Sequence, residues 1–286
     1  MECGFKMKMN AQQEWSWLLA IDLFFGGLGG ALFLLFQFFH LRLRVAALAL
    51  GLMVIGAAFL MAELGHPLRA WRTLARLRTS WISRGVLFVN LFLGAGALYI
   101  LTSWGGLTWL PWTQDGAVAK VLLFLAGLSA VMVTLYPGFV LAASPSVPFW
   151  NSPMLPVLFF TQSVLTASGI VLLLSRWNLS GGSIQPIESL ALYLIIGNFL
   201  LLTIYLISMN KAGRAAKEAV RLLTHPGSLA WIFGAGALLV GLILPMVIVL
   251  WVPTAAYLAG ALILCGALLF RYCVLKAGVY VPFHLM

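Results

Sequence analysis

The sequence is poor in charged residues. Only 8% of its 286 residues are charged, and Asp and Glu together number seven. Hydrophobic residues make up 63% of the chain, and the mean hydropathy is +1.04. This composition excludes a soluble globular domain of such a length. We therefore expect an integral membrane protein that forms a single membrane domain over residues 1–286.

Cysteine and histidine are too few and too scattered for a metal cofactor. The three cysteines show no CxxC or longer ligand spacing, which argues against an iron–sulfur cluster or a structural zinc in this chain. The four histidines, His40, His66, His225 and His284, fall at span ends or in loops. A haem inside a helix bundle needs two axial ligands that face each other at membrane depth. No pair meets this condition, so we expect no haem.

Eight apolar stretches occupy nearly the whole chain. Each is close to the roughly 20 residues that a helix needs to cross the hydrocarbon core of a bilayer. They are continuously apolar rather than alternating, which favours helices over barrel strands. The expected spans are residues 15–39, 45–64, 83–103, 118–143, 154–175, 188–208, 229–250 and 255–274. The expected fold class is all-α, with eight transmembrane helices and both termini on the same side.

Basic residues are concentrated on the side of the termini. Thirteen of the seventeen Lys and Arg residues fall there, so the positive-inside rule places both termini in the cytoplasm. This asymmetry accounts for the net charge of +10 without a nucleic-acid partner. Most of the charge sits in two loops, 65–84 and 209–228, which suit membrane lipid, an acidic protein partner, or both. The nine basic residues in these loops are Arg69, Arg72, Arg76, Arg78, Arg84, Lys211, Arg214, Lys217 and Arg221.

A layer of polar side chains lies inside the spans at one depth. Asp22 lies about 10 Å into the first span. Glu63 ends the second span, Asn90 lies in the third, and Tyr136 lies near the end of the fourth. Burying a carboxylate in lipid is costly unless it faces a cavity or a partner. The layer therefore predicts a pocket that opens from the terminal side.

The residues alone leave several interpretations of this layer open. It suits chemistry on a bound substrate, and it also suits a proton- or ion-coupled transporter that uses Asp22 and Glu63. The two halves of the chain show no inverted repeat, which counts against the transporter. For Asp22, a structural ion pair with Arg84 or Arg271 is a further alternative.

Three segments together resemble a known family. Residues 135–160, LYPGFVLAASPSVPFWNSPMLPVLFF, contain Tyr136-x-Gly138, a small apolar run and a Pro-x-x-Asn-x-Pro-x-x-Pro element. This pattern resembles the signature of the NrfD-like family, the polysulfide reductase membrane subunits. Residues 14–31 resemble that family's first span. Residues 63–85, ELGHPLRAWRTLARLRTSWISRG, resemble its acidic-Leu-Gly-x-Pro-x-Arg-x-Trp loop.

The resemblance implies a haem-free subunit of eight helices that reacts with menaquinone or another quinone. Family members act within an enzyme complex, in the cytoplasmic membrane of bacteria or archaea, and not as enzymes alone. They pair with a ferredoxin-like subunit that bears four iron–sulfur clusters, and often with a molybdopterin-type catalytic subunit. Menaquinone is expected near the face on which the cluster subunit docks.

The resemblance also implies roles for individual residues. Tyr136 would hydrogen-bond a quinone carbonyl, Glu63 would relay a proton, and Asp22 would face the quinone head group. In the polysulfide reductase pattern the position of Asp22 is His and that of Leu19 is Asn, so the contacts to the head group differ here. Further residues expected at or near the site are Gly138, Asn151, His66, Arg84 and Asn90. Those expected to dock the partner are Arg69, Arg72, Arg76 and Arg78.

Overall fold

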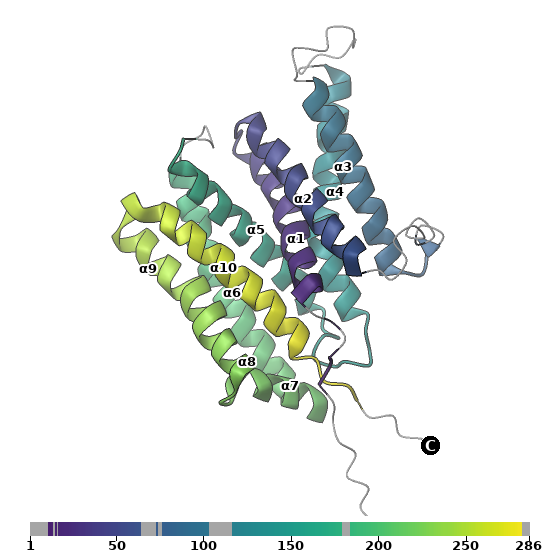
Figure 1. Cartoon of the computed structure of the whole chain (residues 1–286), viewed down its shortest axis with the longest axis vertical. Coiled ribbons are helices and arrows are strands. Elements are labelled where there is room, and N and C mark those ends of the chain that lie inside the picture. Colours follow the sequence, from purple (N-terminus) through teal and green to yellow (C-terminus); the bar gives the residue numbers. More distant parts are fainter. Residues whose placement is uncertain are drawn as a thin grey trace, which may run out of the picture.

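Helices long and apolar enough to cross a membrane form the bundle in Figure 1. The computed structural model describes residues 11–13, 15, 17–63, 73, 76–102, 116–178 and 184–281. Within this part of the chain there are eight such spans, as predicted, and their ends lie within three residues of the expected ones. The first six are α1 (Trp17–Phe38), α2 (Leu43–Glu63), α3 (Trp81–Thr102), α4 (Ala117–Ala142), α5 (Met154–Ser175) and α6 (Gln185–Lys211).

The seventh span changes its helix type along its length. It begins as α8 (Ser228–Trp231), continues as the π-helix η2 (Ile232–Ile243) and ends as α9 (Leu244–Trp251). Pro245 has no N–H, so the usual bond to the carbonyl four residues earlier cannot form there. Just before it, the N–H of Leu244 donates to the carbonyl of Leu239, five residues back. The hydrophobic pattern gave no indication of this wider winding.

The stretch 209–228 is not the plain loop that the sequence predicted. The helix α6 extends to Lys211, and a further helix, α7 (Arg214–Thr224), follows it. One face of α7 is buried against the protein through side chains such as Ala216, Ala219 and Leu223. Its packing partners are α6, α8 and η2. The last span, α10 (Ala256–Lys276), follows the short turn η3 (Pro253–Ala255).

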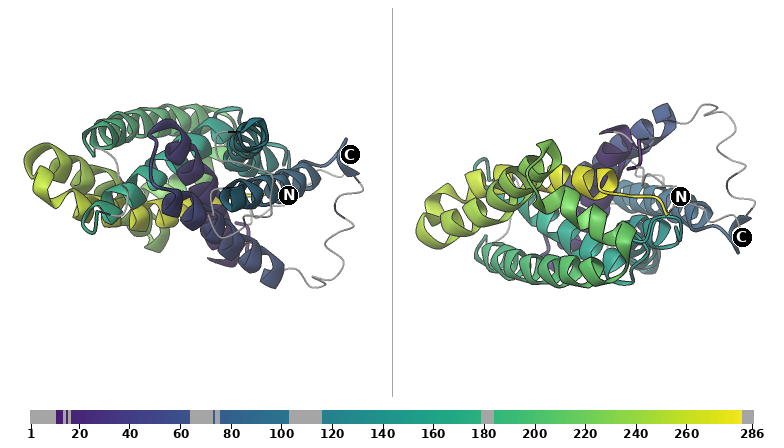
Figure 2. Two further views of the ribbon diagram at one scale, coloured as in Figure 1. Left: turned by 90° about the horizontal axis from the view of Figure 1, so that it is seen from above. Right: turned by 90° about the horizontal axis from the view of Figure 1, so that it is seen from below.

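The helix α1 lies in the centre of the bundle. It packs against α2, α4, α5 and α10, and the views along the long axis show it in the middle of the bundle (Figure 2). Glycines bring its neighbours close. A Cβ atom at Gly29 would lie 2.7 Å from the carbonyl oxygen of Ala49 on α2, and one at Gly30 would lie 3.0 Å from that of Ala130 on α4. The backbones of three helices are therefore nearly in contact.

The described ends of the chain meet at one end of the bundle. The N–H of Gln12 donates to the carbonyl of Gly278 at 2.8 Å. The ring of Trp15 stacks on that of Trp150 with 4.7 Å between centroids, and Trp150 Nε1 donates to the carbonyl of Val274. These contacts join the start of α1, the α4–α5 connection and the end of α10. We call this end the terminal face.

Arg271 on α10 is fully buried between three helices. Its Nε donates to the carbonyl of Leu23 on α1 at 3.1 Å, and its Nη2 donates to Ser163 Oγ on α5 at 3.0 Å. Its Nη1 donates to Ala267 within α10. Among the described residues no carboxylate forms an ion pair with it. Taking a cation out of water is costly, so these neutral acceptors must offset the loss of hydration.

We expect Arg271→Lys to destabilise the protein more than Arg271→Met. A lysine keeps the buried charge but lacks the planar fork that reaches acceptors on three helices, whereas methionine fills a similar volume without a charge. The measurement is the thermal midpoint of each purified variant in the same detergent. Arg176→Met, at an exposed position, is the control. A larger loss of stability for Met than for Lys would contradict this account.

Candidate functional site

The structure brings together the three ionisable residues that the sequence singled out. Asp22 on α1 is only 5% exposed, while Glu63 at the end of α2 and Tyr136 on α4 are half-buried. The carboxylates of Asp22 and Glu63 lie close enough to interact electrostatically, and Asp22 interacts in the same way with Tyr136. Side chains from three helices thus form one polar cluster near the terminal face.

Two glycines make this convergence possible. A Cβ atom at Gly56 on α2 would lie 3.0 Å from the nitrogen of Gly26 and 3.3 Å from the carbonyl oxygen of Asp22. The helix α2 therefore crosses α1 directly beside the backbone of Asp22. A Cβ atom at Gly85 on α3 would overlap the ring of Tyr136. The missing side chain at Gly85 thus provides the space in which the tyrosine ring lies.

Gly85 is a site residue that the sequence analysis missed. Its one signal in the sequence is its place at the end of the 63–85 segment. Depth counting could not find it, because a glycine carries no chemistry of its own. Its importance follows only from the ring of Tyr136, which comes from another helix.

Some buried acceptors have no partner. Among the described residues, Glu63 Oε2 and Gln162 Oε1 accept no hydrogen bond. Gln162 lies on α5 and is 5% exposed. Buried polar atoms in proteins are nearly always paired, so an unpaired one calls for a water, a proton or a ligand. At Glu63 this unpaired oxygen belongs to the polar cluster itself.

The ion-pair alternative for Asp22 is not what the described part of the chain shows. Arg271 bonds carbonyl and hydroxyl oxygens, as described above. Arg84 Nε donates to the carbonyl of Leu77 at 2.9 Å, and its Nη2 donates to that of Arg78 at 2.7 Å. Arg84 therefore organises the turn that leads into α3 rather than neutralising Asp22.

The two predicted asparagines do not point into the cluster. Asn90 is exposed, and its Nδ2 donates to the carbonyl of Val86 in its own helix. Asn151 is also exposed, and its Nδ2 donates to the carbonyl of Ala142 at the end of α4. The structure thus places Asn90 on the outer face of α3 and gives Asn151 a role in closing the α4–α5 connection.

The structure describes three of the remaining predicted site residues, namely Gly138, Arg76 and Arg78. A Cβ atom at Gly138 would overlap the backbone of Pro156, so this motif glycine sets the contact between α4 and α5. Arg76 and Arg78 are exposed at the terminal face, ahead of α3. The other three, His66, Arg69 and Arg72, lie outside the described residues.

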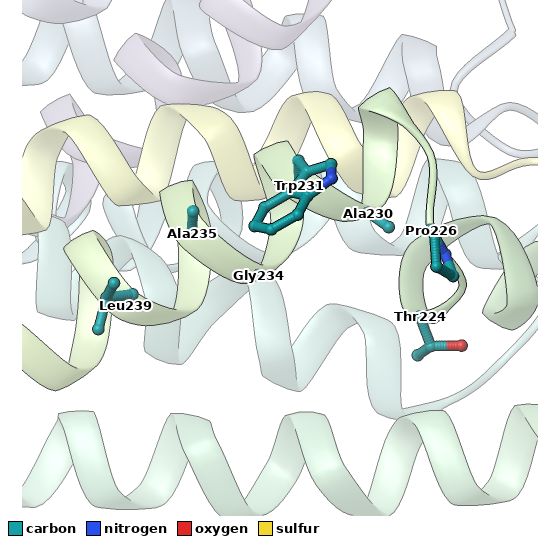
Figure 3. A pocket seen from close by; sticks show the side chains of 7 residues that line it. All are labelled: Thr224, Pro226, Ala230, Trp231, Gly234, Ala235 and Leu239. Carbon is teal, nitrogen blue, oxygen red and sulfur yellow. The ribbon is translucent and has the colours of Figure 1, made fainter.

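Two surface grooves lie away from the polar cluster. One, with a volume of about 410 Å³, runs from the α7–α8 turn along η2 (Figure 3). The other, of about 360 Å³, is lined by residues of α1 and α4 that include Gln37 and Lys120. Neither is lined by Asp22, Glu63 or Tyr136. The pocket predicted to open above the polar layer stays a prediction.

Potential metal ligands do not gather in the described part of the chain. No three His, Cys, Asp or Glu side chains come together there in a way that could hold an ion. Of the described cysteines, Cys265 is exposed and Cys273 is buried, and both are free thiols. The absence of a haem and of an iron–sulfur cluster stays a prediction from the sequence.

Comparison with known proteins assigns the chain to a family. Residues 6–282 match the sequence profile described as Polysulphide reductase, NrfD. The chain is 27% identical to Protein NrfD of Escherichia coli (strain K12), and the match covers 92% of this chain and 94% of the relative. It is 26% identical to one of the chains of polysulfide reductase from Wolinella succinogenes, with the same two coverages.

A shorter match links the sequence to a third protein. It is 32% identical over 127 residues to one of the subunits of sulfite dehydrogenase from Allochromatium vinosum, which is 41% of this chain and 37% of the relative. The family match, in contrast, runs through every one of the eight spans and includes the whole polar cluster. The chain is therefore a multi-pass membrane protein that belongs to the NrfD polysulphide reductase family.

Proposed function

We propose that this chain is the quinone-reactive membrane subunit of a respiratory oxidoreductase, and that it exchanges electrons between menaquinone and an iron–sulfur partner. The observation that carries the proposal is the convergence of Asp22, Glu63 and Tyr136 from three helices. Two of the relatives support it by name, since one belongs to a polysulfide reductase and the other to a sulfite dehydrogenase.

The chemistry of the cluster suits a quinone head group. Reducing a quinone to a quinol takes two electrons and two protons, and oxidation of the quinol returns them. The Tyr136 hydroxyl is a hydrogen-bond donor for a quinone carbonyl. The carboxyl groups of Asp22 and Glu63 can give and take protons at the same place. Next to them, Phe25 stacks on Phe59 with 6.4 Å between centroids, which adds an apolar wall for a flat ring.

The positions of the two carboxyl groups suggest the order of proton transfer. Glu63 is the last residue of α2 and lies at the terminal face, whereas Asp22 lies deeper and is nearly closed off from solvent. A proton from the aqueous side would reach Glu63 first and Asp22 second.

The turn before α3 suggests where an electron-carrying partner would dock. Arg84 holds this turn through the carbonyls of Leu77 and Arg78, and Gly85, the next residue, touches the ring of Tyr136. A ferredoxin-like subunit docked on Arg76 and Arg78 would therefore sit directly over the cluster. A molybdopterin-type subunit would complete the complex on the far side of that partner. By the positive-inside rule this face is cytoplasmic.

The first test concerns assembly. We expect Arg76→Glu together with Arg78→Glu to release the iron–sulfur subunit, because two exposed charges that attract it become repulsive. The measurement is the amount of that subunit that copurifies with the tagged chain at physiological ionic strength. Arg44→Glu with Lys120→Glu, at the opposite end of the bundle, is the matched control. Full assembly of the reversed variant would place the docking surface elsewhere.

The second test concerns the hydroxyl of Tyr136. Tyr136→Phe keeps the ring, so the contact with Gly85 and the fold should survive. Losing a buried hydrogen bond to the substrate costs about 1–3 kcal/mol, so turnover with a short-chain menaquinol should fall roughly 5- to 150-fold. Asp22→Asn should keep the shape but stop proton exchange, and Glu63→Gln should have a milder effect. Unchanged turnover in all three assembled variants would place the quinone elsewhere.

The third test concerns the space for the tyrosine ring. Gly85→Ala should lower quinol turnover although no chemical group is removed, because the new Cβ atom displaces the ring of Tyr136. Gly94→Ala is the matched control, since it lies on the same helix and its Cβ atom would meet nothing within 4 Å. Turnover is measured on intact complexes of both variants. If both retain full activity, the position of the ring does not matter for the reaction.

A further inference from the structure

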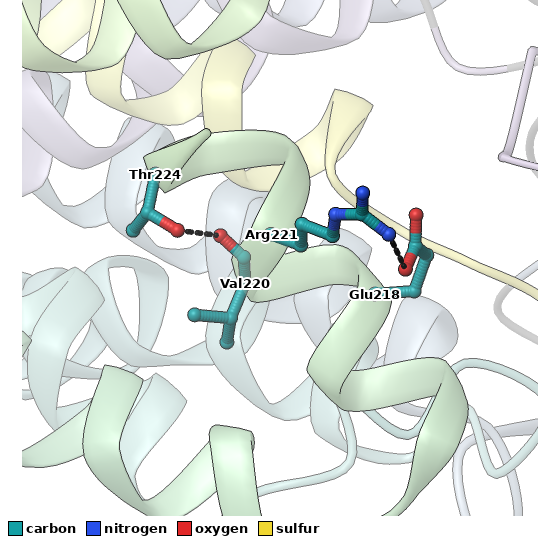
Figure 4. A network of polar contacts seen from close by, with 4 residues as sticks. All are labelled: Glu218, Val220, Arg221 and Thr224. Atoms are coloured by element: carbon teal, nitrogen blue, oxygen red, sulfur yellow. Dashed lines mark hydrogen bonds and ion pairs between the residues drawn. The ribbon is translucent and has the colours of Figure 1, made fainter. Parts of the chain in front are cut away.

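The outer face of α7 is a stripe of basic side chains. Arg214, Lys217, Arg221 and Thr224 are spaced by three, four and three residues, which puts them on one side of a helix. All four are exposed. Arg221 approaches Glu218 at 3.7 Å (Figure 4), but both side chains are open to solvent, so this pair is weak. The other two cations have no ion pair among the described residues. The stripe is thus strongly positive.

This stripe leads into the groove on η2. Thr224, its last member, lines the groove together with Pro226, and the remaining lining residues are Ala230, Trp231, Gly234, Ala235 and Leu239 (Figure 3). Trp231 is 72% exposed and Leu239 is 44% exposed, while the small side chains at 234 and 235 leave the hollow between them. The groove itself is apolar along η2, and the basic stripe begins beyond its α7 end, one helical turn from Thr224 at Arg221.

We propose that this groove binds one anionic phospholipid, with an acyl chain along η2 and the phosphate beside Lys217 and Arg221. The apolar floor matches a hydrocarbon tail, and the stripe complements the negative headgroup. Trp231 lies at the depth where tryptophan usually anchors a helix at the interface. The Thr224 hydroxyl already donates to the carbonyl of Val220 at 3.0 Å. The hydrogen-bond donors for the phosphate therefore come from Lys217 and Arg221.

The packing of α7 separates this surface from the proposed quinone site. It contacts α6, α8 and η2, whereas Asp22, Glu63 and Tyr136 come from α1, α2 and α4. The stripe on α7 can therefore bind a membrane lipid without involving the proposed quinone site. This inference does not rest on the proposed function.

The experiment measures lipid binding to the purified full-length protein. The delipidated protein is titrated with mixed micelles of phosphatidylglycerol and phosphatidylcholine, and native mass spectrometry counts each lipid bound. We expect a preference for phosphatidylglycerol. Lys217→Gln with Arg221→Gln should lower that preference about fivefold for each charge removed and leave phosphatidylcholine binding unchanged. Arg44→Gln with Lys120→Gln, at the opposite end, is the control for charge.

A second variant tests the groove itself. Gly234→Leu should reduce binding of both lipids by filling the hollow. A Cβ atom at Gly234 would meet nothing within 4 Å, so the fold should tolerate the change. Gly197→Leu on α6, where a Cβ atom is equally free, is the control for added bulk. Thermal midpoints are recorded for every variant.

The outcomes are distinct. Loss of phosphatidylglycerol preference in the charge variant, with loss of both lipids in Gly234→Leu, supports the site. An unchanged lipid count in either variant overturns it. If the charge variant binds lipid as the wild type does but no longer retains its protein partner, the stripe docks a protein and not a lipid.

Discussion

The hydrogen bonds of Arg271 fix the helix on which the rest of the bundle depends. Its Nε binds the carbonyl of Leu23, which is the residue next to Asp22. Two turns further along α1, the close approaches at Gly29 and Gly30 leave no room for the helix to shift toward α2 or α4. The central helix is thus held by α10, α2 and α4. Among the described residues no hydrogen bond to the Asp22 carboxyl group is seen, so this packing sets its position there.

Polar groups inside the bundle fall into two kinds, which differ in whether they are satisfied. Asn198 on α6 accepts a hydrogen bond from Thr161 at 2.9 Å and donates to Leu194, and Tyr205 donates to the carbonyl of Phe149. These groups hold helices together and have little capacity left to form further hydrogen bonds. Glu63, in contrast, has a buried oxygen for which the described part of the chain provides no hydrogen-bond partner. In apolar surroundings an unpaired polar group costs free energy of folding. Proteins keep such groups mainly where they bind a ligand or take up a proton.

A sequence can predict how deep in the bundle a side chain lies, but not on which face of its helix it lies. Counting residues from each span end gives the depth of a side chain, because the rise per residue is constant. That is why Asp22 and Tyr136 were expected at one level and do lie together. Asn90 shares their level but faces outward, because depth says nothing about which face of a helix a residue occupies. That information needs the neighbouring helices, which no single sequence supplies.

Two features escaped the sequence for a different reason. The helix α7 has 11 residues and interrupts its short apolar pairs with charged residues, so a search for long apolar runs cannot find it. The π-helix η2 is apolar throughout, so the hydrophobic pattern does not distinguish its winding from that of an α-helix. The roles of Gly85 and Arg271 likewise depend on groups from other helices, namely the ring of Tyr136 and the carbonyl of Leu23.

The terminal face therefore has two basic regions with different surroundings, although the sequence shows them as similar clusters of charge. The turn before α3 is tied by Arg84 to the helix that touches Tyr136, so a protein bound there has a short path to the polar cluster. The charges on α7 lie next to the apolar groove on η2, and α7 packs against helices that do not contribute to that cluster. An electron must travel a short distance to the substrate, whereas a lipid headgroup needs only a positive surface at the membrane boundary. On these proposals, the positive charge of the terminal face would serve an electron carrier at one end and a phospholipid at the other.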